Sequence, residues 1–192
     1  YKSVFPEEGL PIHKCIRYTD MAIEKFFEVA SKQPWFKHTI FVLTSDHTNL
    51  SDHKQYQTDI GGFCSPIVIY DPSNEKKSGI QNGIAQQIDI MPTVLGILGY
   101  DKPFLSFGCD LTTTPMRETF AVNYLNGIYQ YCKYGYVLQF DGQATRGIYR
   151  LDDHLMQHNL KGKIKEQAKM ERELKAIIYQ YMYRMVHDKL MP

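Results

Sequence analysis

The apolar run Thr39–Thr44, together with the Asp46-His47 pair that follows it, constrains this chain more than any other feature. β-Branched and aromatic residues dominate the run, which predicts a buried strand. Asp46 and His47 would then project from the C-terminal end of that strand. In open α/β sheets, binding crevices lie just outside the carboxyl ends of the strands. A carboxylate beside a neutral imidazole therefore supplies, at this place, half of the ligands of a metal site.

Helical and extended patterns alternate along the first half of the chain. Apolar residues recur at helical spacing over His13–Ala30 and Ile84–Leu98, so we expect a helix in each range. Pro66–Tyr70 predicts a second buried strand. Pro92 must lie near the start of the second helix or kink it, and we expect Asp89 at the N-cap or just before it. The alternation predicts an α/β fold with a mostly parallel central sheet flanked by helices.

The second half predicts an antiparallel extension of the sheet followed by a helix. Aromatic and β-branched residues over Gly127–Phe140 predict a hairpin, and Gly147–Leu151 predicts another short strand. Ile164–Met185 has the spacing of a long amphipathic helix. Lysine, arginine and glutamate interleave along this segment, which favours a solvated charged face over a membrane-surface helix.

Length and composition limit the classes of protein. The 192 residues fit one domain, and we expect an α/β part at 1–126, antiparallel strands at 127–162 and a C-terminal helix at 163–188. Lysine and arginine total 22 against 21 aspartates and glutamates, so no global basic field indicates a nucleic-acid partner. The four cysteines are widely spaced and predict neither a disulfide framework nor a zinc knuckle.

Targeting signals are not visible in the sequence. No stretch approaches the roughly 18 apolar residues that span a bilayer, and the chain opens with Tyr1-Lys2-Ser3 rather than a signal peptide. We expect these residues to be a soluble piece of a longer protein.

The Asp46-His47 pair also has a plainer interpretation, in which a loop carboxylate caps a turn beside a solvated histidine. A catalytic metal needs three or more protein ligands and an open position, so the remaining ligands must lie elsewhere. His53, in the loop beyond the pair, is a candidate contact for an anionic substrate, against the alternative of an exposed loop histidine. His154 and His158 have helical metal-ligand spacing but lie among loop residues, which favours solvated surface.

Several motifs in a fixed order carry a family resemblance. They are Phe41–His47, Ser65–Pro72, Gln87–Leu95 and Leu98-Gly99-Tyr100. The order resembles the C-terminal part of a sulfatase-type catalytic domain of the alkaline phosphatase superfamily, nearest to the lipoteichoic-acid-synthase-like phosphoglycerol transferases and bacterial sulfatase-family proteins. The Asp-x-x-Pro-Thr-x-Leu segment that starts at Asp89 is the more specific signature.

The resemblance implies a metal-dependent reaction. Asp46 and His47 would be two ligands of a divalent metal, Mn²⁺ first, with Zn²⁺, Mg²⁺ and Ca²⁺ as alternatives. The substrate would be an anionic phosphate or sulfate ester, lipid- or glycan-linked. The family's nucleophile is expected upstream, because Cys64-Ser65-Pro66 has Val68 where the sulfatase motif requires arginine. We therefore expect no catalytic nucleophile in this chain, which would be inactive alone.

The resemblance also implies a setting and leaves alternatives. The parent protein would be membrane-tethered, with this domain outside the cytoplasm of a bacterium, in the periplasm or at the cell surface. Many hydrolytic and phosphoethanolamine-transferring relatives have glycine after Asp-His, whereas this chain has Thr48. Sulfatase, phosphoglycerol transferase and phosphoethanolamine transferase thus stay open. The alternative is a non-catalytic α/β binding module in which the half-site is vestigial.

Overall fold

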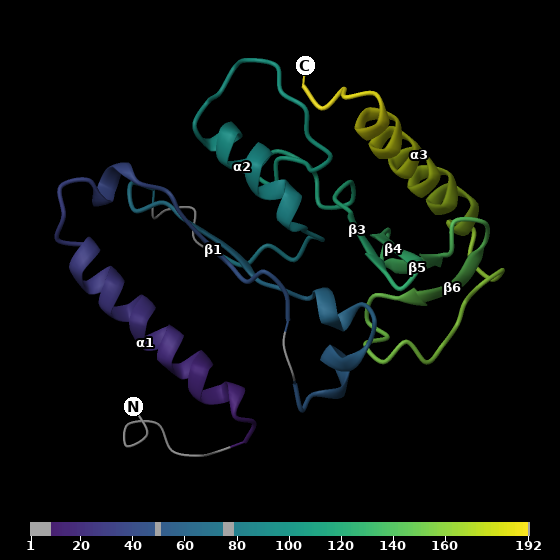
Figure 1. Cartoon of the computed structure of the whole chain (residues 1–192), viewed down its shortest axis with the longest axis horizontal. Helices are drawn as coiled ribbons and strands as arrows, with labels where there is room; N and C mark the ends of the chain where they lie inside the picture. Colours follow the sequence, from purple (N-terminus) through teal and green to yellow (C-terminus); the bar gives the residue numbers. More distant parts are fainter. Residues whose placement is uncertain (1–8, 49–50, 75–78, 192) are drawn as a thin grey trace. The chain divides into compact units, whose positions relative to one another are not determined.

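The computed structural model describes residues 9–48, 51–74 and 79–191 and divides the chain into two compact units, residues 1–80 and 81–192 (Figure 1). Unit 1 contains α1 (Ile12–Ala30), η1 (Phe36–His38), β1 (Phe41–Thr44), η2 (Lys54–Gln57), η3 (Gly61–Phe63) and β2 (Ile67–Tyr70). Unit 2 contains η5 (Gln87–Asp89), α2 (Ile90–Ile97), β3 (Ala121–Leu125), β4 (Ile128–Lys133), β5 (Tyr136–Phe140), β6 (Thr145–Arg150) and α3 (Gln167–Val186). The predicted single domain over 1–192 stays a prediction.

An aromatic cluster packs α1 against the two strands of unit 1. The ring of Phe27, on α1, lies 5.0 Å from Phe41 of β1 and 5.9 Å from Tyr70 of β2, centroid to centroid. Phe41 and Tyr70 stack on each other at 6.0 Å. Such pairs add about 0.5–1.5 kcal/mol each beyond the area they bury. The predicted helix over 13–30 is confirmed, and its aromatic stripe fixes it to the sheet.

The two strands of unit 1 pair antiparallel, which differs from the predicted mostly parallel sheet. Phe41 lies opposite Tyr70, and Thr44 lies opposite Ile67. Parallel neighbours need a crossover, usually through an α-helix, and the described residues between β1 and β2 form only the short 3-10 helices η2 and η3. The chain therefore returns directly beside its own strand.

The strands of unit 1 were also predicted to be buried, and in this structure they are not. Exposure alternates along β1, and Val42 is 36% exposed. Val68 of β2 is 50% exposed. A two-stranded sheet has no flanking strands, so its backbone edges and parts of its faces stay open.

Unit 2 is built on a four-stranded antiparallel sheet in the order β3-β4-β5-β6. The predicted hairpin is confirmed as β4 and β5, and the strand predicted at 147–151 is confirmed as β6. β3 was not predicted. Its link to β4 is the tight turn Asn126-Gly127, with φ of 51° and 83°, and this left-handed geometry matches the twist of a hairpin.

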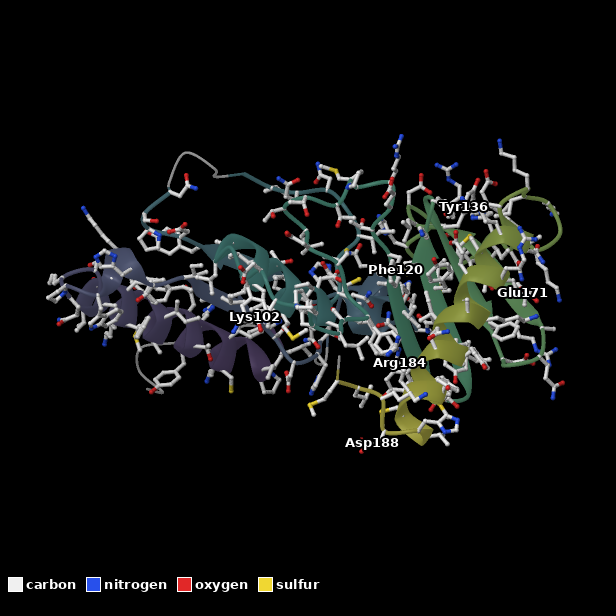
Figure 2. All side chains as sticks on the ribbon, turned by 90° about the horizontal axis from the view of Figure 1, so that it is seen from above. Lys102, Phe120, Tyr136, Glu171, Arg184 and Asp188 are labelled. Carbon is white, nitrogen blue, oxygen red and sulfur yellow. The ribbon has the colours of Figure 1, made fainter. Side chains whose placement is uncertain are left out.

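The C-terminal helix covers one face of the four-stranded sheet. Met170 and Leu174 of α3 pack with Leu138 and Ile148 of the strands, and all four are fully buried. Figure 2 shows α3 lying over the strands, with Glu171 toward its N-terminal end and Arg184 toward its C-terminal end. In the described part of the chain, no helix combines the length and the apolar character needed to cross a bilayer.

A carboxylate on α3 joins the helix to β4 and to the turn that follows it through two tyrosines. Glu173 accepts hydrogen bonds from the hydroxyls of Tyr131, at 2.9 Å, and Tyr134, at 2.8 Å. Lys133 Nζ lies 3.5 Å from the same carboxylate. Burial opposes ionisation of Glu173, but the hydrogen bonds and the lysine outweigh it and lower the pKa of the carboxyl. Burial together with the Glu173 contact raises the pKa of Tyr131.

Replacing Glu173 by leucine should loosen α3, because the nearly buried Tyr131 hydroxyl would lose its acceptor. We expect a loss of about 2 kcal/mol in the free energy of unfolding of unit 2, measured by chemical denaturation and by hydrogen exchange of the α3 amides. The double variant with Tyr131→Phe should recover part of this loss, since both polar partners are then removed. If Glu173→Leu were as stable as wild type, the carboxylate would not stabilise the docked helix.

The pH dependence of this contact has a definite sign. A carboxyl whose pKa is lowered in the folded state stabilises that state above its ordinary pKa, here 4.5. The contribution should be complete at neutral pH and disappear as the pH falls from 4.5 through the lowered folded-state pKa. Glu173→Leu should remove this dependence from the acid limb of the stability curve.

Candidate metal site

Asp46 and His47 lie just past the C-terminal end of β1, as predicted, and their side chains converge. His47 Nε2 is 3.3 Å from Asp46 Oδ2, with 67% and 85% of the two side chains exposed. The backbone N–H of His47 donates to Asp46 Oδ1 at 2.9 Å. The carboxylate thus caps the turn, as in the plainer interpretation, and also presents its second oxygen to the imidazole.

The second ring nitrogen of His47 sets the orientation of the ring. Nδ1 lies 2.6 Å from the carbonyl oxygen of Thr48. A carbonyl only accepts hydrogen bonds, so Nδ1 carries the proton in this contact. In the neutral ring, Nε2 is then a lone-pair atom facing a carboxylate oxygen. Two acceptors that converge in this way favour a proton or a metal cation between them, and a backbone carbonyl on the other nitrogen is the usual partner of a metal-binding histidine.

Thr48 ties the pair to the turn formed by η3. Its Oγ1 donates to the carbonyl of Gly62 at 2.7 Å, across 14 positions of sequence. The N–H of Gly62 donates in turn to Thr58 O at 3.0 Å. Sequence reasoning noted Thr48 as a departure from relatives but missed this contact.

Gly61 is required by the close packing of that turn. A Cβ there would lie 1.9 Å from the carbonyl oxygen of Gln55, so the backbone would have to shift to admit it. At Gly62, by contrast, a Cβ would meet nothing within 4 Å. The turn that accepts the Thr48 hydroxyl is therefore closely constrained.

The donor set fits part of a divalent-metal site. Aspartate oxygen and imidazole nitrogen suit Mn²⁺, Zn²⁺ and related ions. Within residues 9–48, 51–74 and 79–191, no group of three or more histidine, cysteine, aspartate or glutamate side chains is placed to hold a metal. The two residues fit as ligands that need further partners.

His53 lies in the same loop but has its own contacts. Its Nε2 is 3.8 Å from Asp52 Oδ1, and its ring packs edge-on against Tyr56 at 6.4 Å. The side chain is 76% exposed. It is accessible to a ligand, and its predicted contact with substrate stays a prediction.

The second signature motif has a structural role in unit 2. Asp89, fully buried, accepts hydrogen bonds from the backbone N–H groups of Gln86, at 2.9 Å, and Cys109, at 2.8 Å. It is the N-cap of α2, as expected, and closes a capping box with Gln86 around η5. The predicted helix over 84–98 is therefore shorter, Ile90–Ile97. Burial raises the pKa of Asp89, and the two N–H donors oppose that rise.

Thr93 completes this motif one helical turn later. Its hydroxyl donates to Asp89 O at 2.6 Å and accepts from Leu111 N at 3.0 Å. Gly108 permits the approach, because a Cβ there would lie 2.3 Å from Ile88 O. Asp89 and Thr93 thus accept hydrogen bonds from the backbone N–H groups of Cys109 and Leu111, in the segment that passes the start of α2.

Comparison with protein families identifies one matching model. Residues 12–100 match the Sulfatase family, a span that includes the Asp46-His47 pair and the motif from Asp89 to Thr93. Over 132 residues the chain is 28% identical to the lipoteichoic acid synthase of Staphylococcus aureus, strains USA300 and NCTC 8325 among others. That alignment covers 63% of this chain and 20% of the synthase.

Solved structures share the fold. A protein of the alkaline phosphatase superfamily from Vibrio parahaemolyticus superposes with a TM-score of 0.77 and 20% identity, covering 98% of this chain and 45% of that one. A protein solved with its substrate D-glucosamine-2-N,6-O-disulfate superposes with a TM-score of 0.57 and 19% identity, covering 87% and 39%. This chain thus spans a fifth of the synthase and less than half of each solved chain.

Proposed function

We propose that this protein acts in metal-dependent hydrolysis or transfer of anionic phosphate or sulfate esters. Its residues 12–100 match the Sulfatase family, and it shares the fold of a protein of the alkaline phosphatase superfamily. The observation that carries this proposal is the convergence of Asp46 Oδ2 and His47 Nε2 at 3.3 Å, with Nδ1 bound to a backbone carbonyl. That arrangement turns one carboxylate oxygen and one imidazole nitrogen toward each other, and the two would hold a divalent cation, Mn²⁺ first.

The roles of the chain's own residues follow from this geometry. Asp46 and His47 would hold the ion, and Thr48 O would keep the imidazole in the tautomer that binds it. A bound divalent cation supplies positive charge for an anionic ester and lowers the pKa of a coordinated nucleophile. His53, exposed in the same loop, would contact the anionic group of the substrate. The nucleophile and the remaining ligands would come from the longer protein, so this chain would be inactive alone.

The substrate class follows from two similarities. One relative is a lipoteichoic acid synthase, and one protein of the same fold was solved with a disulfated glucosamine as its substrate. These similarities support an anionic ester as substrate, and we propose that it is lipid- or glycan-linked. By the first similarity we favour phosphoglycerol transfer over sulfate hydrolysis, in an extracytoplasmic domain of a membrane-tethered bacterial protein.

The test is metal-dependent turnover by the full-length protein. After stripping with EDTA, Mn²⁺, Zn²⁺, Mg²⁺ and Ca²⁺ are returned singly, and activity is followed on fluorescent phosphatidylglycerol, p-nitrophenyl phosphate and p-nitrophenyl sulfate. We expect EDTA to abolish turnover and Mn²⁺ to restore it best, with phosphatidylglycerol preferred. No metal-dependent turnover of any ester, and no Mn²⁺ binding, would instead support the non-catalytic binding module.

A further inference from the structure

We infer that the Thr48 side chain is a positioning residue for His47, because its hydroxyl fixes the peptide whose carbonyl selects the metal-binding tautomer of the imidazole. The contacts involved all lie within unit 1, and their effect on metal binding rests on the proposed function.

The first step is the contact between neighbouring residues. Thr48 O lies 2.6 Å from His47 Nδ1 and favours the proton on that nitrogen, whereas Asp46 Oδ2, 3.3 Å from Nε2, competes for it. If this peptide turned away, Nδ1 would lose its acceptor. The proton could then move to Nε2, which would remove the lone pair that faces Asp46.

The second step is what stops the peptide from turning. Thr48 Oγ1 donates to Gly62 O at 2.7 Å in a partly buried contact. This hydrogen bond joins the residue after the Asp-His pair to a turn 14 positions further along the chain. A valine at position 48 would keep the branched shape and lose the bond.

The third step is the rigidity of the acceptor. Gly62 N donates to Thr58 O at 3.0 Å, and Gly61 N donates to Thr58 Oγ1 at 3.1 Å. Since Gly61 cannot accept a Cβ beside Gln55 O, the turn has little room to shift. These contacts hold the Gly62 carbonyl in place as the acceptor of the Thr48 hydroxyl. Gly61 and Gly62 therefore both contribute to the position of Thr48.

The experiment compares Thr48→Val with Thr48→Ser in the full-length protein. In the metal-free state, at a pH where imidazole is neutral, two-bond ¹H–¹⁵N correlation spectra report the tautomer of His47. We expect wild type and Thr48→Ser to carry the proton on Nδ1, and Thr48→Val to shift toward Nε2. Calorimetric titration should then give a Mn²⁺ affinity roughly tenfold weaker for Thr48→Val, with Thr48→Ser close to wild type.

Two results would overturn the inference. Thr48→Val could leave the tautomer and the Mn²⁺ affinity unchanged, or valine and serine could weaken binding equally, which would assign the effect to shape rather than to the hydroxyl. If Thr48→Val fails to fold by thermal melt, Thr48→Ala, which also removes the hydroxyl and adds no bulk, replaces it and should produce the same two changes. Because the tautomer is read without metal, it tests Thr48 even if wild type binds no Mn²⁺, an outcome that would reject the proposed function instead.

Discussion

Alanine at Asp46 or at His47 is expected to lower the Mn²⁺ affinity of the full-length protein by about 100-fold or more, because each substitution removes a ligand and not merely a residue that orients one. The two side chains converge to 3.3 Å, so the loss of either leaves the other with an incomplete site. Calorimetric titration measures the affinity, and turnover on phosphatidylglycerol should fall in parallel. Equal Mn²⁺ affinity in both variants and in wild type would remove the ligand assignment.

The loop contains its own matched control, a second aspartate-histidine pair. Asp52 and His53 are also adjacent and exposed, with Oδ1 and Nε2 3.8 Å apart. Asp52→Ala and His53→Ala should leave Mn²⁺ affinity near wild type. His53→Ala should instead raise the KM for the ester while the metal dependence persists. A fall in Mn²⁺ affinity at either position would move the metal to this second pair.

The helices were predictable from the sequence to the extent that their apolar spacing is regular. His13–Ala30 was predicted and α1 ends at Ala30. The second helix was predicted six residues too early because Ile84–Gln86 precedes the capping box formed by Gln86 and Asp89. The capping box closes η5, the short 3-10 helix before α2, and a buried carboxylate that reaches Cys109 leaves no periodic signal.

The strands show a different limit. β1 and β2 were found from their β-branched residues, but pairing direction depends on the connection between them, which composition does not specify. β3 was missed although Asn126-Gly127, a strong hairpin signal, stands directly after it. The run before the turn, Ala121–Leu125, is only five residues long and has Asn123 at its centre, so its own residues are a weak strand signal.

In the candidate site, the contact between neighbouring residues could be predicted from the sequence, but the contact across the loop could not. Asp46 and His47 are adjacent, so a strand-end position was enough to bring them together. The Thr48–Gly62 hydrogen bond crosses 14 positions and ends on a backbone carbonyl, which every residue possesses. No residue pattern marks such an acceptor, and only the folded loop reveals it.

Replacing Asp89 by alanine is expected to give the largest loss of stability in unit 2. The carboxylate is fully buried and satisfies two backbone N–H groups, those of Gln86 and Cys109. Removing it leaves both donors without an acceptor in a place that water does not reach, so the free energy of unfolding should fall by about 3 kcal/mol. Chemical denaturation measures the loss, and faster hydrogen exchange at the two amides would locate it.

Two comparisons separate burial from hydrogen bonding as the cause. Asp152 accepts two bonds of 2.8 Å from Arg150, yet its side chain is 66% exposed. Water can replace those bonds, so Asp152→Ala should be as stable as wild type within error. Asp89→Asn keeps one acceptor oxygen and turns an amide toward the other N–H, and should lose about half as much stability as Asp89→Ala. If Asp89→Ala were no worse than Asp152→Ala, the motif from Asp89 to Thr93 would not be what fixes the segment across α2.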